Sequence, residues 1–227
     1  MTAADAQEGA GGGRFALLGN PNTGKTTLFN RLTGLRHKTA NFPGTTLEAR
    51  VGRVELPTEG ATETAAIIDL PGIYSLELDQ LEAEVCRAVL EGRAAPTGET
   101  VAAPTAVCVV ADATNLPRNL MLVGEALRRR LPTVIAVNMI DLARKRGITV
   151  EPAALERALG CGVVCISARE GEGSRTFRQR CRELGSRTTR RRVLAKGCER
   201  GLRKSTRRFL TERWMPGRIR SQIVWTA

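Results

Sequence analysis

Few residues of this sequence could build a zinc site or a disulfide framework. It contains a single histidine, His37, and its six cysteines include no C-x-x-C pair. Structural zinc sites take four Cys or His ligands at short spacings, and disulfide-rich domains are typical of small secreted chains. The cysteine pattern therefore argues against both classes. Cys108 and Cys165 lie in apolar runs, so we expect them to be small buried hydrophobic side chains.

Long hydrophobic runs are absent too. The longest ones, near residues 106–111 and 133–137, fall far short of the ~18 residues that a membrane-spanning helix needs. Residues 1–13 carry acidic side chains and no apolar core, so we predict a disordered lead rather than a signal peptide. The chain as written is expected to be soluble.

Acidic residues are scarce only in the last quarter of the chain. Residues 1–170 hold 18 Lys and Arg against 19 Asp and Glu, whereas residues 171–227 hold 17 against 4. The formal net charge of +12 therefore belongs to this last segment. Its apolar residues are scattered without a clear helical period. We predict one short helix near 174–184, as the last helix of the fold, and disorder beyond it.

Between these segments, short β-branched and apolar runs alternate with helical patterns. This alternation predicts an α/β fold with a six-stranded, mostly parallel sheet flanked by helices. Residues 92–104 contain Gly, Pro and Thr without a period, so we expect a surface loop there. The expected strands are 14–18, 50–56, 65–70, 106–112, 133–138 and 163–167, and the expected helices are 25–35, 78–90, 116–130 and 152–159.

A glycine-rich loop lies between the first expected strand and the first expected helix. Residues 19–26 (GNPNTGKT) match the pattern G-x-x-x-x-G-K-[ST]. In such P-loops, backbone N–H groups and the N-terminus of the following helix bind phosphate oxygens. We expect Lys25 to reach the β- and γ-phosphates and the Thr26 hydroxyl to bind Mg²⁺. The nucleotide-binding residues of this loop would be Gly19, Asn20, Pro21, Asn22, Thr23, Gly24, Lys25, Thr26 and Thr27.

The sequence DLPG lies at the end of the expected strand 65–70. Its Asp69 carboxylate would hold Mg²⁺ through water, and Gly72 would leave its N–H free for the γ-phosphate. The next residue is Ile73, where many GTPases place the glutamine that orients the attacking water. Because isoleucine cannot hydrogen-bond to water, we predict slow intrinsic hydrolysis.

A guanine-recognition pattern closes the fifth expected strand. Residues 138–141 (NMID) match N-K-x-D with methionine in the lysine position. The two carboxylate oxygens of Asp141 can accept from guanine N1–H and N2–H₂, a donor pair that adenine lacks. Asn138 would bond to the base and tie its loop to the P-loop, and the Ala168 N–H would contact guanine O6. The base-binding residues would be Asn138, Met139, Asp141, Ser167 and Ala168.

A segment typical of a nucleotide-sensing loop lies between the P-loop and the DLPG sequence, at residues 41–48 (NFPGTTLE). Such a loop needs one hydroxyl that joins Mg²⁺ only when the γ-phosphate is present. Thr45 and Thr46 both qualify by their chemistry. The alternative is a solvent-exposed threonine pair in a turn.

Together these motifs resemble the G domain of the ferrous iron transport protein B family, a Ras-like P-loop NTPase. The likeness spans residues 14–173 and includes two phrases, DLPG-x-YSL and DATNL-x-RNL, that are not general GTPase motifs. The segments that carry it are residues 19–30 (GNPNTGKTTLFN), 41–48 (NFPGTTLE), 69–76 (DLPGIYSL), 112–120 (DATNLPRNL), 138–147 (NMIDLARKRG) and 167–173 (SAREGEG).

The resemblance implies further roles. Thr46 rather than Thr45 would take the sensing role, and Asn22 would coordinate K⁺, which speeds hydrolysis in the family. The domain would sit on the cytoplasmic face of the inner membrane and gate Fe²⁺ uptake. Its partners would be guanine nucleotide, a transmembrane permease domain of which this sequence shows no sign, and further copies of itself. The catalytic residues would be Lys25, Thr46 and Gly72. The Mg²⁺ ligands would be Thr26, Thr46 and Asp69.

Residues 174–227 depart from the family pattern, in which a helical region and a long transmembrane domain follow the G domain. We interpret this segment as a fragment or a frameshifted reading of a longer gene. The alternatives are a basic tail that binds anionic lipid or nucleic acid by charge, and a solvated, disordered tail.

Three functions are compatible with the motifs. The first is a slow GTPase domain that regulates ferrous iron transport, for which nucleic acid is not an expected partner. The second is a free-standing soluble GTPase with a basic tail that binds RNA or the ribosome. The third is a nucleotide-binding module without useful catalysis, which Ile73 keeps open. The family phrases favour the first.

Overall fold

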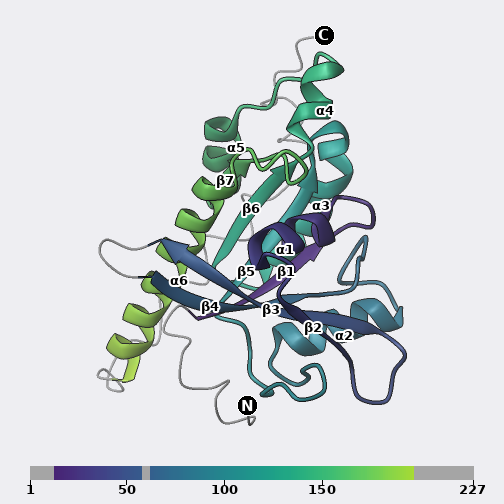
Figure 1. Cartoon of the computed structure of the whole chain (residues 1–227), viewed down its shortest axis with the longest axis vertical. Coiled ribbons are helices and arrows are strands. Elements are labelled where there is room, and N and C mark those ends of the chain that lie inside the picture. The colour runs from purple at the N-terminus through teal and green to yellow at the C-terminus, as the bar shows by residue number, and fades with distance from the viewer. Residues whose placement is uncertain (1–12, 58–61, 197–227) are drawn as a thin grey trace.

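The computed structural model describes the backbone of residues 13–57 and 62–196, with side chains through residue 185 (Figure 1). The predicted disordered lead 1–13 lies outside the described residues except for Gly13, and so does the predicted tail beyond residue 196. In the part that is described, no helix combines the length and the hydropathy needed to cross a membrane.

The described residues form one seven-stranded sheet. Its strands are β1 (Arg14–Gly19), β2 (His37–Asn41), β3 (Glu48–Pro57), β4 (Thr62–Asp69), β5 (Ala106–Asp112), β6 (Thr133–Asn138) and β7 (Gly162–Cys165). They are ordered β2-β3-β4-β1-β5-β6-β7 (Figure 1). The pairs β3–β4 and β2–β3 are antiparallel, and the pairs from β4 through β1, β5 and β6 to β7 are parallel.

The mostly parallel α/β architecture is confirmed, but the expected number of six strands was wrong. The missed strand is β2, whose residues (HKTAN) include one aliphatic side chain, Ala40, and are half-buried or exposed. A strand at the sheet edge needs no apolar alternation, because its backbone hydrogen bonds to β3 hold it in place. The last expected strand, 163–167, is β7 and ends earlier, at Cys165.

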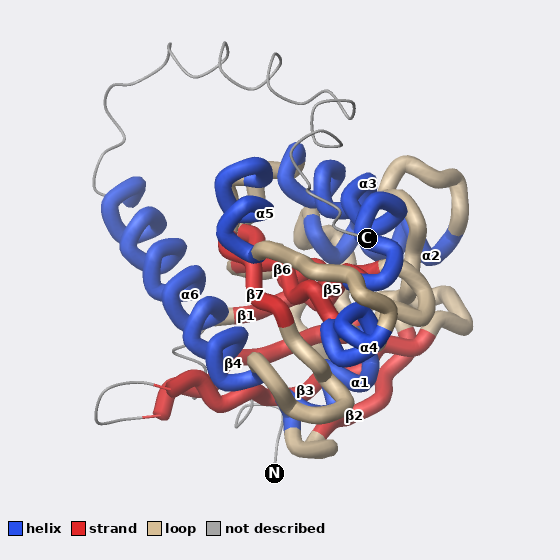
Figure 2. The backbone as a smooth tube through the Cα atoms, turned by 90° about the horizontal axis from the view of Figure 1, so that it is seen from above, coloured by secondary structure: helices blue, strands red, loops and turns tan. Residues whose placement is uncertain are grey.

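Helices cover both faces of the sheet. They are α1 (Lys25–Thr33), α2 (Leu81–Leu90), α3 (Leu116–Arg128), α4 (Ile140–Lys145), α5 (Pro152–Leu159) and α6 (Ser174–Lys196). Along β1, Phe15 and Leu17 pack toward α1 and α6, whereas Ala16 and Leu18 pack toward α2, α3 and α5. Figure 2 shows the sheet between α1 and the group α2, α3 and α5. The central strands are therefore buried on both faces.

The helix predicted over 174–184 is longer in the structure, where α6 continues to Lys196 (Figure 2). Its first half packs on the sheet, with Phe177 fully buried and Cys181 nearly so. Arginine is a good helix former, so an arginine-rich segment can extend a helix whose first turns are anchored. The packed unit thus extends past residue 173, where the predicted G domain ends.

Truncation of the α6 anchor should destabilise the whole domain. We expect Phe177→Ala to lower the free energy of unfolding by roughly 3–5 kcal/mol, because it opens a cavity between α6 and the sheet. Urea-induced unfolding followed by circular dichroism measures this change. Thr176→Ala, at an exposed position of the same turn, is the control and should stay within about 0.5 kcal/mol of wild type. Equal stability of the two variants would contradict the packing of α6.

Candidate functional site

The carboxyl ends of the parallel strands bring the motif loops together at one edge of the sheet. The P-loop follows β1, the DLPG sequence begins at Asp69, the last residue of β4, and Asn138 is the last residue of β6. In open parallel sheets, this edge is where ligands bind. Residues that are distant in the sequence thereby become neighbours.

The P-loop turns at two residues with left-handed backbone conformations. Asn22 has a φ of 64°, and Gly24, the N-cap of α1, has a φ of 78°. The Thr23 hydroxyl donates to the Asn20 carbonyl at 2.9 Å and closes the turn. No side chain of the described residues caps α1, so N–H groups of its first turn are left to meet an anion.

Two P-loop side chains differ sharply in exposure. The Asn20 carboxamide is buried, and neither its oxygen nor its nitrogen has a hydrogen-bond partner among the described residues. Thr27 is exposed on α1. Buried unpaired amides are uncommon, so Asn20 marks a polar position at the base of the loop that a water molecule could satisfy.

Lys25, Thr26 and Asp69 form a charged cluster where the P-loop meets the end of β4. Lys25 is only 9% exposed, and its ammonium donates to Asp69 Oδ1 and to the Leu70 carbonyl. The Thr26 hydroxyl donates to Asp69 Oδ2 at 3.1 Å. Hydroxyl and carboxylate oxygens are the ligands that Mg²⁺ prefers. The cluster therefore supplies both a cation for phosphate and an oxygen pair suited to a hard metal ion.

The DLPG segment and Ile73 lie directly against the P-loop. A Cβ atom at Gly72 would lie 3.3 Å from the backbone nitrogen and Cα of Pro21. The Ile73 N–H donates to the Gly19 carbonyl at 3.1 Å, and the Ile73 side chain is 2% exposed, within the core. A side chain in this position faces away from solvent, so it cannot orient water at the sheet edge.

The Asn138 carboxamide joins the loops after three different strands. Its Nδ2 donates to the Thr23 carbonyl at 2.8 Å, and its Oδ1 accepts from the Ala168 N–H at 2.9 Å. The sequence analysis assigned this Ala168 N–H to guanine O6. In the structure it is already donated to Asn138, so a base would have to share or replace that contact. Met139, with a φ of 64°, then starts α4 and places Asp141 in its first turn.

Several supports of the loop after β7 were missed by the sequence analysis. The Arg31 guanidinium on α1 donates to the carbonyls of Ala168 and Arg169. Arg144 on α4 forms two 2.8 Å hydrogen bonds to Glu172, and this contact lowers the pKa of the Glu172 carboxyl. Ser167 is fully buried at the start of the loop. Because the partners lie far apart in the sequence, no local pattern could reveal these pairs.

The nucleotide-sensing loop lies between β2 and β3, and neither of its threonines is bonded to the charged cluster in the described part of the chain. The Thr45 hydroxyl donates to the Phe42 carbonyl at 3.1 Å and accepts from the Leu47 N–H at 3.2 Å, so it is used within the loop. Thr46 is exposed, and its hydroxyl has no hydrogen-bond partner in the described part of the chain. The expected role of Thr46 at Mg²⁺ therefore stays a prediction.

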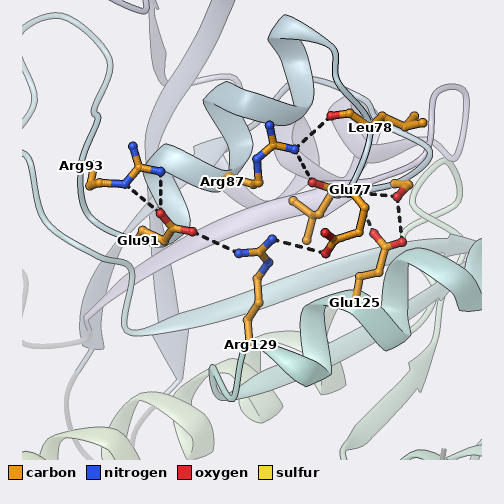
Figure 3. A network of polar contacts seen from close by, with 9 residues as sticks. Glu77, Leu78, Arg87, Glu91, Arg93, Glu125 and Arg129 are labelled. Carbon is orange, nitrogen blue, oxygen red and sulfur yellow. Dashed lines mark hydrogen bonds and ion pairs between the residues drawn. The ribbon is translucent and has the colours of Figure 1, made fainter.

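The segment after DLPG is held by a network that the sequence analysis also missed (Figure 3). Glu125 on α3 is 4% exposed and accepts from the Ser75 hydroxyl at 2.7 Å and from the Leu76 N–H at 2.6 Å. Arg87 on α2 donates to the Leu76 carbonyl. A carboxylate on the mostly apolar buried face of α3 was the available sequence signal.

The five cysteines that the structure describes are buried or partly buried free thiols. Cys108 is fully buried, as expected, whereas Cys165 is only partly buried. Burial raises the pKa of the Cys86 and Cys161 thiols to about 12. No group of three His, Cys, Asp or Glu side chains in the described ranges could hold a metal ion by itself.

Comparisons with known proteins agree with this geometry. A family model described as Ferrous iron transport protein B matches residues 13–181. The chain belongs to this family. The Fe(2+) transporter FeoB of Escherichia coli K12 is 38% identical over 166 residues, which are 70% of this chain and 19% of that protein. The Fe(2+) transporter FeoB of Salmonella typhimurium matches with the same identity and coverage. The chain thus spans about a fifth of the length of these relatives.

Solved structures show which part of the family's proteins this chain resembles. The G domain of T. maritima FeoB is 34% identical with a TM-score of 0.63, and the match covers 75% of this chain and 97% of that one. The cytosolic domain of L. pneumophila FeoB is 33% identical with a TM-score of 0.66, and the match covers 75% of this chain and 63% of that one. The T. maritima cytosolic domain in its GMPPNP form is 34% identical with a TM-score of 0.65, and the match covers 76% of this chain and 63% of that one. The described fold therefore corresponds to the G domain.

The approach of Asn138 to the P-loop can be tested at Gly24. A Cβ atom there would overlap Asn138 Nδ2, in addition to the strain of a positive φ. Gly34, with a φ of 60° and nothing within 4 Å, is a matched control for strain alone. We expect Gly34→Ala to cost about 1 kcal/mol and Gly24→Ala about 1–3 kcal/mol more, because Asn138 loses its partners. Urea-induced unfolding without nucleotide measures both, and equal losses would contradict the contact.

Proposed function

We propose that this chain is a GTP-binding domain that hydrolyses GTP slowly. The observation that carries the proposal is the convergence of Lys25, Thr26 and Asp69 on one side of the P-loop with Asn138 on the other. A phosphate chain and a base can thus be held at one sheet edge. Membership of the family, whose solved members include GDP and GMPPNP forms, supports the same ligand class.

The phosphate end would be bound by the P-loop. Lys25 would exchange its contact with Asp69 for phosphate oxygens, since its ammonium needs an anionic partner in a buried position. Thr26 and Asp69 would hold Mg²⁺, which offsets charge on the phosphates. The Gly72 N–H, next to Pro21, would face the γ-phosphate, and Thr46 would approach with its loop.

The base end would select guanine through Asp141. Its carboxylate lies in the first turn of α4, close to Asn138 in the chain and half-buried. Asn138 fixes the P-loop and the Ser167–Ala168 turn relative to each other, so the base site and the phosphate site keep a constant separation. A pocket built to satisfy a carboxylate rejects a base without two donors.

Hydrolysis would be slow without an added cation. Ile73 is buried and offers no group to orient water. The side chain of Asn22 is exposed on the P-loop and has no hydrogen-bond partner among the described residues, so its carboxamide oxygen could bind K⁺ near the phosphates. A second cation there would stabilise charge that develops during phosphoryl transfer.

In the cell, the domain would regulate Fe²⁺ passage through a membrane permease domain. This part of the proposal comes from the relatives, which are named Fe(2+) transporters and of which this chain spans about a fifth. The alternative, a GTPase with an RNA- or ribosome-binding tail, lacks support from these relatives.

Replacement of Asp141 should change base preference. We expect Asp141→Asn to bind GTP at least about tenfold more weakly and to improve binding of xanthosine triphosphate, whose O2 can accept from the new amide. Competition with fluorescent GDP in the presence of Mg²⁺ measures both affinities. Glu170→Gln, an exposed charge change nearby, should leave them unaltered. Unchanged GTP affinity in Asp141→Asn would refute the base assignment.

Potassium should stimulate hydrolysis through Asn22. In single-turnover assays we expect the wild type to hydrolyse GTP roughly tenfold or more faster in K⁺ than in Na⁺, because K⁺ stabilises the transferring phosphate. Asn22→Ala should abolish this difference and retain GDP binding. A potassium effect that survives the substitution would exclude Asn22 as its ligand.

A further inference from the structure

The residues directly after Gly72 are fixed to the body of the domain. Ile73 is held by its N–H, which donates to Gly19, and by its buried side chain. Leu76, three residues on, is fully buried in the same core. Between these two anchors, only Tyr74 is exposed, and its ring lies under the Arg118 guanidinium at 4.3 Å.

Glu125 makes two buried polar contacts to this segment. One carboxylate oxygen accepts from Ser75 Oγ and the other from the Leu76 N–H, at 2.7 and 2.6 Å (Figure 3). Its neighbours on α3, Leu122 and Val123, are fully buried. A carboxylate among apolar side chains is costly unless both oxygens are satisfied, and hydrogen bonds to a charged acceptor are the strong ones.

The backbone carbonyl of Leu76 is bonded to a second helix, α2. Arg87 on α2 donates to the carbonyls of Leu76 and Leu78, the latter at 3.0 Å (Figure 3). Arg129, the residue after α3, contacts Glu77 at 3.6 Å and Glu91 at 3.2 Å. The peptide groups on both sides of Leu76 are therefore fixed between α2 and α3.

We propose that Glu125 is a positioning residue of the GTPase. By holding Ser75 and Leu76 on α3, it keeps the Gly72 peptide against Pro21, where the γ-phosphate would meet it. This role rests on the proposed GTP binding. It predicts a specific asymmetry: GDP lacks the γ-phosphate, so the clamp matters for GTP and its analogues but not for GDP. A carboxylate that only stabilised the core would affect both nucleotides alike.

The substitutions separate positioning from packing. Glu125→Met keeps the length of the side chain and removes both acceptors. Glu125→Gln keeps one oxygen for the Leu76 N–H and can donate to Ser75 Oγ. Ser75→Ala removes a single donor from the clamp and is a milder second variant if Glu125→Met does not fold. Glu84→Gln, at an exposed position of α2, is the matched charge control.

The binding experiment uses the full chain and measures the dissociation constants of GDP and GMPPNP with Mg²⁺, together with single-turnover GTP hydrolysis. For Glu125→Met we expect GDP affinity within about twofold of wild type, and both GMPPNP affinity and hydrolysis reduced about tenfold, as small misplacements at a reacting centre do. Glu125→Gln should recover most of the loss, Ser75→Ala should show a smaller loss of the same kind, and Glu84→Gln should match wild type.

A spectroscopic readout follows from Tyr74, which is the only tyrosine of the chain. Incorporation of 3-fluorotyrosine gives one ¹⁹F resonance in the clamped segment. We expect one narrow line in the wild type and in Glu125→Gln, and a broadened or split line in Glu125→Met.

Two results would overturn the proposal. One is an equal loss of GDP and GMPPNP affinity in Glu125→Met, and the other is wild-type hydrolysis with an unchanged ¹⁹F line. Failure of the wild type to bind guanine nucleotide would instead refute the proposed function, and the ¹⁹F line would still report whether Glu125 holds the segment.

Discussion

The buried Asn138 carboxamide is the contact on which the site geometry depends. It donates to the P-loop at Thr23 and accepts from the loop after β7 at Ala168, while its own backbone ends β6. A rigid planar group that bonds to two loops fixes their separation, and burial makes each bond costly to lose. The P-loop and the loop after β7 are thereby set at a constant distance, whatever the sequences of the intervening helices.

The charged side chains beside the P-loop also satisfy one another. Lys25 and Thr26 are both bonded to the Asp69 carboxylate, so a buried ammonium and a buried carboxylate neutralise each other. An anionic ligand that takes over Lys25 frees Asp69 for a cation. Binding of phosphate and of a metal ion to this cluster would therefore be coupled through one carboxylate.

The two loops that would meet the γ-phosphate are held unequally. After Gly72, the chain is fixed by Ile73, by Leu76 and by hydrogen bonds from two helices. The loop with Thr46 is fixed through the buried Phe42, whose N–H donates to the Leu47 carbonyl at 3.0 Å, and Thr46 itself is exposed. Few buried contacts mean low local stability, so the loop that carries Thr46 should deform more easily than the segment after Gly72.

By itself, the sequence determined the fold class, the strand-loop-helix context of the P-loop, and the family. These are local properties: strands and helices follow from the period of apolar residues, and a P-loop needs its glycines and lysine in one short segment. The edge strand β2, the length of α6 and the clamps made by Glu125 and Arg31 were decided only by the tertiary structure. β2 lacks an apolar alternation and is held by backbone hydrogen bonds to the neighbouring strand β3. The clamps and the anchor of α6 on the sheet depend on partners far along the chain, so no window of sequence contains both halves of these interactions. The same reason explains why the Ala168 N–H, assigned to a ligand from its motif, proved to be bonded to Asn138.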